Sequence, residues 1–174
     1  IQNRIQSKDA RIRLLLSLSA NLKVTDWLTL QARGNLDYSA DKLRQKFYAS
    51  TATALCGMNG RYIEMDYQET QMYGDVMAMV KKQLNDFTLD VAIGGSINDR
   101  ITNSTRIDSK NASLKYANVF NLANIVMSSS ASIDQKIDAH YQLQSVFATA
   151  QIGYKEGVFL DLTARNDWSS TLAY

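Results

Sequence analysis

The sequence predicts an all-β fold: about six antiparallel strands in three hairpins that form part of a large transmembrane β-barrel. Six stretches alternate apolar and polar residues with a period of two, which is typical of strands with one apolar and one wet face. The stretches are joined alternately by short turns and long polar segments. Proline is absent from all 174 residues. Because proline cannot donate to a β-ladder, its absence favours long paired strands.

The first predicted hairpin joins residues 11–22 to residues 27–38 through a short turn at 23–26. The apolar phase of the first stretch ends at Leu22, and that of the second ends at the aromatic Tyr38. Arg33 and Asp37 belong to the polar phase of the second stretch. The apolar phases comprise Ile12, Leu14, Leu16, Leu18, Ala20 and Leu22, followed by Leu28, Leu30, Ala32, Gly34, Leu36 and Tyr38.

The second predicted hairpin joins residues 72–82 to residues 87–99 through a turn at 84–86. Its first stretch has the weakest alternation, and its second contains Gly94 and Gly95, which predict a bulge or a tight bend. The apolar phases comprise Met72, Val76, Ala78 and Val80, followed by Phe87, Leu89, Val91, Ile93, Gly95 and Ile97.

The third predicted hairpin joins residues 145–154 to residues 157–168 through a turn at 155–157. Asp161, Thr163 and Arg165 alternate with the apolar residues of its second stretch. The apolar phases comprise Val146, Ala148, Ala150, Ile152 and Tyr154, followed by Val158, Leu160, Leu162, Ala164 and Trp168.

The connections between the hairpins, roughly 39–70 and 101–139, are long and polar, whereas the turns within hairpins are short. This asymmetry is typical of bacterial outer-membrane barrels. An apolar phase of ten residues at ~45° tilt spans about 23 Å, close to the ~25 Å apolar band of such barrels. The residues expected to face lipid are Leu28, Leu30, Leu36, Phe87, Leu89, Val91, Ile93, Val158, Leu160 and Leu162.

A soluble β-sandwich also alternates and remains the alternative fold. Sandwich strands average about 5–6 residues, whereas the stretches here reach ten or more, and their wet face carries charged residues in mid-strand. A wide aqueous lumen accommodates such charges, which favours the barrel. The two folds differ in whether the protein stays soluble without detergent.

Composition excludes several other classes. The net charge of +2 and the lack of a dense Lys/Arg cluster give no indication of nucleic-acid binding. No apolar run approaches the ~18 residues of a transmembrane helix, and the first residues lack the apolar segment of a signal peptide. The single cysteine, Cys56, excludes an internal disulfide framework.

The final hairpin, "LQSVFATAQIGYKEGVFLDLTARNDWSSTL", closely resembles the SusC/RagA family of TonB-dependent outer-membrane transporters of the Bacteroidetes. The stretch "VTDWLTL" at 24–30 is similar to the sequence around a turn in that family. The resemblance implies a barrel of about 22 strands with a plugged lumen. Residues 1–174 are then expected to be part of one barrel domain, with the plug domain and signal peptide outside this sequence.

The resemblance further implies import of oligosaccharides or peptides across the outer membrane, with a SusD-like surface lipoprotein as a lid and TonB as the energy-coupling partner. Membrane lipid is the remaining expected partner, no cofactor is expected, and enzymatic activity is not expected. A non-transporting barrel or adhesin, whose long surface loops bind a partner, is the alternative function. Finding a plug domain encoded upstream would favour the transporter over the non-transporting barrel or adhesin.

Individual residues give weaker indications. Aromatic side chains in the long segments could stack on sugar rings, although packing within the loops is the simpler and favoured explanation; they are Tyr62, Tyr67, Tyr116 and Phe120. The only histidine, His140, lies in no cluster with metal-ligand spacing and is expected in a solvated loop at the rim. Glu64, Asp66 and Glu69 do not by themselves indicate a hydrolase.

Overall fold

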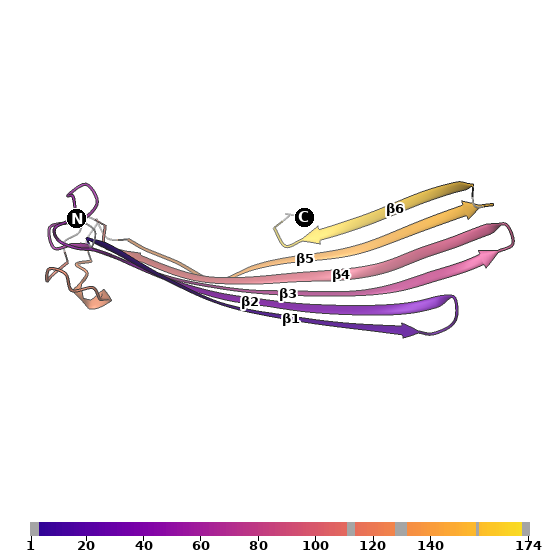
Figure 1. Cartoon of the computed structure of the whole chain (residues 1–174), viewed down its shortest axis with the longest axis horizontal. Helices are drawn as coiled ribbons and strands as arrows, with labels where there is room; N and C mark the ends of the chain where they lie inside the picture. Colours follow the sequence, from indigo (N-terminus) through magenta and orange to yellow (C-terminus); the bar gives the residue numbers. More distant parts are fainter. Residues whose placement is uncertain (1–3, 111–113, 128–131, 156, 172–174) are drawn as a thin grey trace. The chain divides into compact units, whose positions relative to one another are not determined.

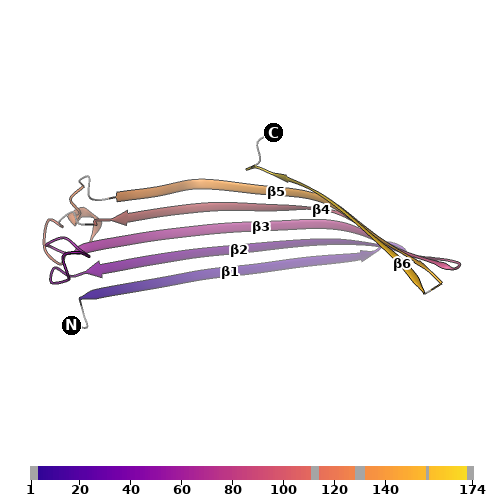
Figure 2. The same cartoon turned by 90° about the horizontal axis from the view of Figure 1, so that it is seen from above.

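The computed structural model describes residues 4–110, 114–127, 132–155 and 157–171. These residues form one antiparallel sheet in which the strands lie side by side in the order of the sequence (Figures 1 and 2). The strands are β1 (Ile5–Lys23), β2 (Leu28–Phe47), β3 (Arg61–Leu84), β4 (Phe87–Asp108), β5 (Ser132–Tyr154) and β6 (Val158–Ser169), with one 3-10 turn, η1 (Leu122–Asn124). The predicted all-β class, with six strands in three hairpins, is confirmed.

The strands are longer than the apolar alternation predicts. β2 continues to Phe47, β3 begins at Arg61, β4 continues to Asp108, and β5 begins at Ser132. The predicted long loops at 39–70 and 101–139 are therefore wrong in their bounds, and the connections are 48–60 and 109–131. The added strand residues are mostly polar on both faces, so no apolar phase marks them in the sequence.

The chain divides into two compact units. Unit 1 comprises Ile1–Arg13, Tyr38–Glu69 and Thr102–Ala139, and unit 2 comprises Leu14–Asp37, Thr70–Ile101 and His140–Tyr174. The two long connections belong to unit 1, and the three short turns belong to unit 2. No helix in the described part of the chain is long and apolar enough to cross a membrane.

The turns of unit 2 are held by backbone hydrogen bonds. At the β3–β4 turn, Asn85 adopts a left-handed conformation with φ 53°, which asparagine tolerates better than most residues. The β5–β6 turn is joined to it, because the Lys155 N–H donates to the carbonyl of Asp86 at 2.9 Å. In the β1–β2 turn, the N–H groups of Val24 and Thr25 both donate to the carbonyl of Leu28.

Unit 1 contains a small hydrophobic core where the 109–131 connection meets β3 and β4. Tyr62, Leu114 and Ile125 are buried there, and Ile107 and Phe120 pack against them. Asn124 holds the connection in shape, since its side-chain amide donates to the carbonyls of Tyr116 and Val119 and its Oδ1 accepts from the Tyr116 N–H.

Candidate functional site

The two faces of the sheet in unit 2 are defined by the pairing of β5 with β6. Leu160 lies opposite Ile152, and Leu162 lies opposite Ala150. Residues directly opposite in an antiparallel pair share a face, so the two predicted apolar phases join into one continuous apolar surface. The shared face is as the alternation predicts, and its contact with lipid remains a prediction.

The other face of the same hairpin is polar. Gln151 lies opposite Asp161, and the Gln151 amide donates to the Asp161 carboxylate at 2.7 Å. Thr149 and Thr163 form the next pair on this face. Adjacent residues of β6 therefore face opposite sides of the sheet, with Leu162 on the apolar side and Asp161 and Thr163 on the polar side.

The apolar face of unit 2 carries large side chains that nothing in the described chain covers. Leu162 on β6 is 53% exposed, and Val146 on the neighbouring β5 is 52% exposed. Exposure of this extent over neighbouring strands is typical of a surface that contacts an apolar phase or a partner. Of the ten predicted lipid-facing residues, Leu30, Phe87, Ile93, Val158, Leu160 and Leu162 are exposed, and Leu28, Leu36, Leu89 and Val91 are half-buried.

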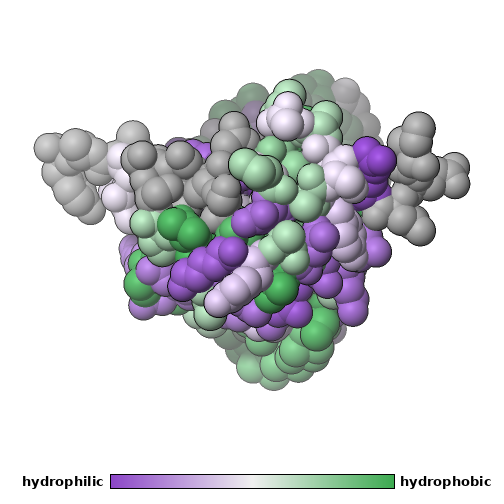
Figure 3. Space-filling model, turned by 90° about the vertical axis from the view of Figure 1, so that its left-hand side faces the viewer, coloured by the Kyte–Doolittle hydropathy of each residue, from purple (hydrophilic) through white to green (hydrophobic). Residues whose placement is uncertain are grey.

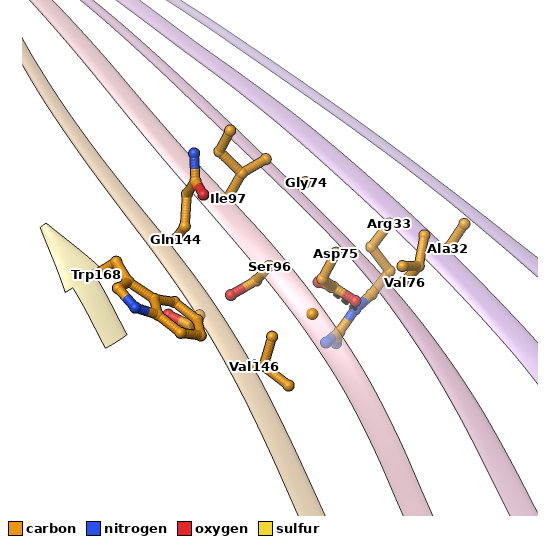
Figure 4. A pocket seen from close by; sticks show the side chains of 12 residues that line it. Ala32, Arg33, Gly74, Asp75, Val76, Ser96, Ile97, Gln144, Val146 and Trp168 are labelled. Carbon is orange, nitrogen blue, oxygen red and sulfur yellow. Dashed lines mark hydrogen bonds and ion pairs between the residues drawn. The ribbon is translucent and has the colours of Figure 1, made fainter. Parts of the chain in front are cut away.

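Aromatic residues lie at the turn end of this face. Phe87 and Tyr154, the aromatic residues of the apolar phases beside the 84–86 and 155–157 turns, are in contact, with ring centroids 4.9 Å apart. A hollow of about 690 Å³ lies beside β1, β2, β3 and β4 and is lined by Leu22, Leu30 and Ile93, among others. A second hollow of about 630 Å³ is lined by residues that include Val146 and Trp168 (Figure 4).

Ion pairs cross the polar face of unit 2. The Arg33 guanidinium on β2 donates to both oxygens of Asp75 on β3, at 3.1 and 3.0 Å (Figure 4). The Asp75 side chain is fully buried, whereas that of Arg33 is 47% exposed. Arg165 contacts Asp167 at 2.8 Å and donates to the Ser145 hydroxyl at 3.0 Å. Charges in mid-strand are thus satisfied by cross-strand and same-strand partners, which sequence spacing does not reveal.

Gly94 leaves room for an aromatic ring on the polar face. A Cβ at Gly94 would lie 2.7 Å from Cζ of Phe147 and 2.7 Å from the carbonyl oxygen of Val76. β4 runs without interruption through Gly94 and Gly95, so the close approach of Phe147 accounts for the glycine at 94. A ring packed over a strand glycine compensates for the missing side chain.

The four predicted loop aromatics are not one group. Tyr62 and Tyr67 lie on β3 rather than in a loop, because the strand begins earlier than predicted. Tyr62 and Phe120 come together, with ring centroids 6.3 Å apart, and Phe120 also meets Tyr48 at 5.0 Å. Tyr116 is 71% exposed, which leaves it the most accessible of the four.

Burial and hydrogen bonds shift the pKa values of two side chains in unit 1, Tyr62 and Asp108. Burial and a hydrogen bond to Glu64 raise the pKa of Tyr62 to about 12. Burial opposes ionisation of Asp108, but hydrogen bonds from the Arg61 guanidinium and the Lys110 N–H outweigh it, so the pKa of Asp108 lies below its ordinary value. Both Arg61–Asp108 hydrogen bonds are 2.8 Å long. The sequence separation of 47 residues hides this pair from any local motif.

His140 lies on β5 rather than in the loop that the sequence predicts. Its Nε2 is 2.8 Å from the carboxylate of Asp99, which also accepts a hydrogen bond from Gln142 at 2.9 Å. In the described part of the chain, no cluster of three or more metal-ligating side chains is positioned to hold an ion.

Comparison with known proteins finds similarity in structure. Over 98% of its length the chain superposes on a chain of the RagAB peptide transporter, with a TM-score of 0.81 and 18% sequence identity. Structures of the RagAB peptide importer in the open-open and closed-closed states match 96% of the chain with TM-scores of 0.79 and 0.78, at 18% and 19% identity. The chain spans 18–19% of the length of these transporter chains. No protein-family model and no curated sequence matches it.

The resemblance to SusC/RagA transporters that the final hairpin indicates is therefore matched by a likeness of fold along almost the whole chain. At 18% identity this likeness concerns the fold. The sheet of six antiparallel strands corresponds to about a fifth of the length of the RagAB transporter chain.

Proposed function

We propose that this chain forms part of the barrel wall of a TonB-dependent outer-membrane importer of peptides or oligosaccharides. The observation that carries the proposal is the superposition of 98% of the chain on a RagAB peptide transporter chain with a TM-score of 0.81. The resemblance of the final hairpin to the SusC/RagA family supports it independently.

The apolar face of unit 2 contacts lipid in this proposal. Its exposed leucines and isoleucines have no cover in the described chain, and an apolar band of ~25 Å bounded by aromatics is what a membrane barrel presents to the bilayer. The outer edges of β1 and β6 would pair with further strands of the same barrel, because lipid cannot satisfy open backbone N–H and C=O groups.

The polar face lines the lumen. Asp75, Arg33 and Asp161 there are charged groups in mid-strand, which a water-filled or plugged interior tolerates and a bilayer does not. Placing the charged face inward and the apolar face outward is the only assignment of the two faces that leaves Leu160 and Leu162 in an apolar surrounding.

The substrate class we favour is peptides, since the structural neighbours are peptide transporter chains, with oligosaccharides as the second class. A SusD-like lipoprotein and TonB are the proposed partners, TonB acting through a segment outside this sequence. Tyr116, exposed on the 109–131 connection, is the aromatic residue best placed to contact a substrate or lid. Enzymatic activity is not part of the proposal.

Uptake in live cells tests the function. The experiment compares accumulation of labelled oligopeptides and oligosaccharides in cells with the gene, cells lacking it, and cells lacking TonB. Loss of uptake in both deletion strains is the expected result. Uptake that depends on the gene but not on TonB would overturn the energy coupling, and unchanged uptake of both substrate classes would overturn transport.

A non-transporting barrel or adhesin is the second candidate. The observation that favours it is the group of exposed apolar side chains on the long connections, which could bind a partner: Met58, Tyr116, Leu122 and Met127. In that case the gene deletion would abolish surface binding while leaving peptide uptake unchanged.

A further inference from the structure

Three cations alternate along the part of β2 that belongs to unit 1: Lys42, Arg44 and Lys46. Alternate residues of a strand share a face. The contacts agree, because Arg44 Nη2 is 2.9 Å from Glu64 on β3 and Lys46 Nζ lies 5.7 Å from the ring centroid of Phe120, which in turn packs on Tyr62.

β1 adds a fourth cation, Lys8. The Arg11–Asp41 ion pair and the hydrogen bond from Gln45 to Ser7 lie on the other face of the same two strands. Both contacts follow one antiparallel register, which places Lys8 directly opposite Arg44 and diagonal to Lys42. The four side chains form a basic patch, defined here as Lys8, Lys42, Arg44 and Lys46.

The basic patch is not neutralised by its surroundings. The carboxylates on its face of β3 are Glu64 and Asp66, two against four cations. Glu64 lies beneath its partner, with a side chain 16% exposed against 53% for Arg44. Lys42 interacts electrostatically with Glu64, but within the residues that the structure describes neither Lys8 nor Lys42 lies within ion-pair distance of a carboxylate. Like charges directly opposite in a sheet are destabilising, so an external anion bound between Lys8 and Arg44 would relieve this repulsion.

The patch lies directly beyond the apolar phase of its own strands. On β2 this phase ends with Tyr38, and Lys42 is its first charged residue; on β1 it ends with Ile12, and Lys8 is its first charged residue. Four residues of a strand tilted by ~45° rise about 9 Å along the membrane normal. In the proposed membrane placement, this height is the headgroup layer of the outer leaflet.

We propose that the basic patch binds the phosphate groups of outer-leaflet lipid. This inference rests on the proposed outer-membrane function and adds a specific lipid contact to it. Charge complementarity selects an anionic ligand, and the continuity of the patch with the outward apolar phase selects one whose phosphates are attached to acyl chains. Basic clusters beside a membrane-embedded segment bind anionic headgroups in this way.

Binding of lipid A to the purified full-length protein in a neutral detergent tests the inference, measured by native mass spectrometry. The patch variant combines Lys8→Gln, Lys42→Gln and Lys46→Gln and retains Arg44, whose ion pair with Glu64 holds β2 to β3. The matched control variant removes the same charge from unit 2 through Lys23→Gln, Lys81→Gln and Lys155→Gln. Heat-modifiable gel mobility establishes that both variants are folded.

The patch variant is expected to bind lipid A about 100-fold more weakly than the wild type, and the control variant within about threefold of it. Dephosphorylated lipid A should bind both variants and the wild type alike. Equal binding of lipid A by the wild type and the patch variant would overturn the inference, as would displacement of lipid A by millimolar inorganic phosphate alone. If the patch variant does not fold, Lys8→Gln with Lys42→Gln replaces it, with an expected loss of about 20-fold.

Fractionation of cells separates this result from the proposed function. Absence of the wild-type protein from the outer membrane would contradict the proposed function, whatever the lipid-binding result. Recovery of the wild-type protein in the outer membrane with equal lipid A binding by the patch variant would contradict the basic patch alone.

Discussion

Substitution of arginine at Leu162 gives the most direct test of which face of the sheet meets lipid. Leu162 lies opposite Ala150 on the apolar face, 53% exposed in the isolated sheet and near the middle of β6 (Val158–Ser169). An arginine on the lipid face of a barrel near the bilayer midplane costs ~2–4 kcal/mol, because its charge leaves water for hydrocarbon. Leu162→Arg should therefore lower the free energy of unfolding by about this amount.

The residues on either side of Leu162 supply matched controls. Asp161→Arg places the same side chain on the polar face and removes the hydrogen bond from Gln151, a loss of about 0.5–1.5 kcal/mol at an exposed pair. Thr163→Arg is the second polar-face control, one residue beyond. Both should leave the barrel folded, because an arginine on this face remains in the aqueous lumen.

The assay is the full-length protein refolded into lipid vesicles, with folding followed by heat-modifiable gel mobility and stability by denaturant titration. Equal stability of the arginine variants at 161, 162 and 163 would refute the assignment of faces. Loss of folding at Asp161 with tolerance at Leu162 would show that the polar face is the one in contact with lipid.

Three further predictions concern packing, pH and orientation. Gly94→Ala should destabilise the barrel by about 1–3 kcal/mol, because its Cβ would lie 2.7 Å from Phe147, whereas Gly34→Ala, with nothing within 4 Å, should be close to neutral; denaturant titration of both variants compares them. The depressed pKa of Asp108 contributes stability that is present above the unfolded pKa of ~4 and lost as pH falls through the folded pKa, so Asp108→Asn should speed proteolysis of the long connections at pH 7, and the difference from the wild type should shrink as pH falls below ~4. In intact cells that express the protein without Cys56, an impermeant thiol reagent should label Met58→Cys, which lies in a long connection, but not Asp86→Cys, which lies in a short turn. The reverse pattern would invert the orientation.

The hairpins and the division of residues between the two faces of the sheet could be predicted from the sequence. Both follow from local patterns: the period of two in stretches such as 157–168, and the short polar turns between them. Because side-chain direction alternates along any extended chain, the pairing of Leu160 with Ile152 and of Asp161 with Gln151 needed only the correct turn. The likeness of the final hairpin to SusC/RagA transporters was also readable, since it lies in contiguous residues.

Tertiary structure alone decided how far the strands extend and what several polar residues do. The polar halves of β2, β3 and β4 remain extended because Arg44 meets Glu64 and Arg61 meets Asp108 across neighbouring strands. It also placed Tyr62 in a core and His140 beside Asp99 rather than in loops. These contacts join residues 20 to 47 positions apart, and no local periodicity encodes them, because their energy comes from charges and rings that meet only once the sheet has formed.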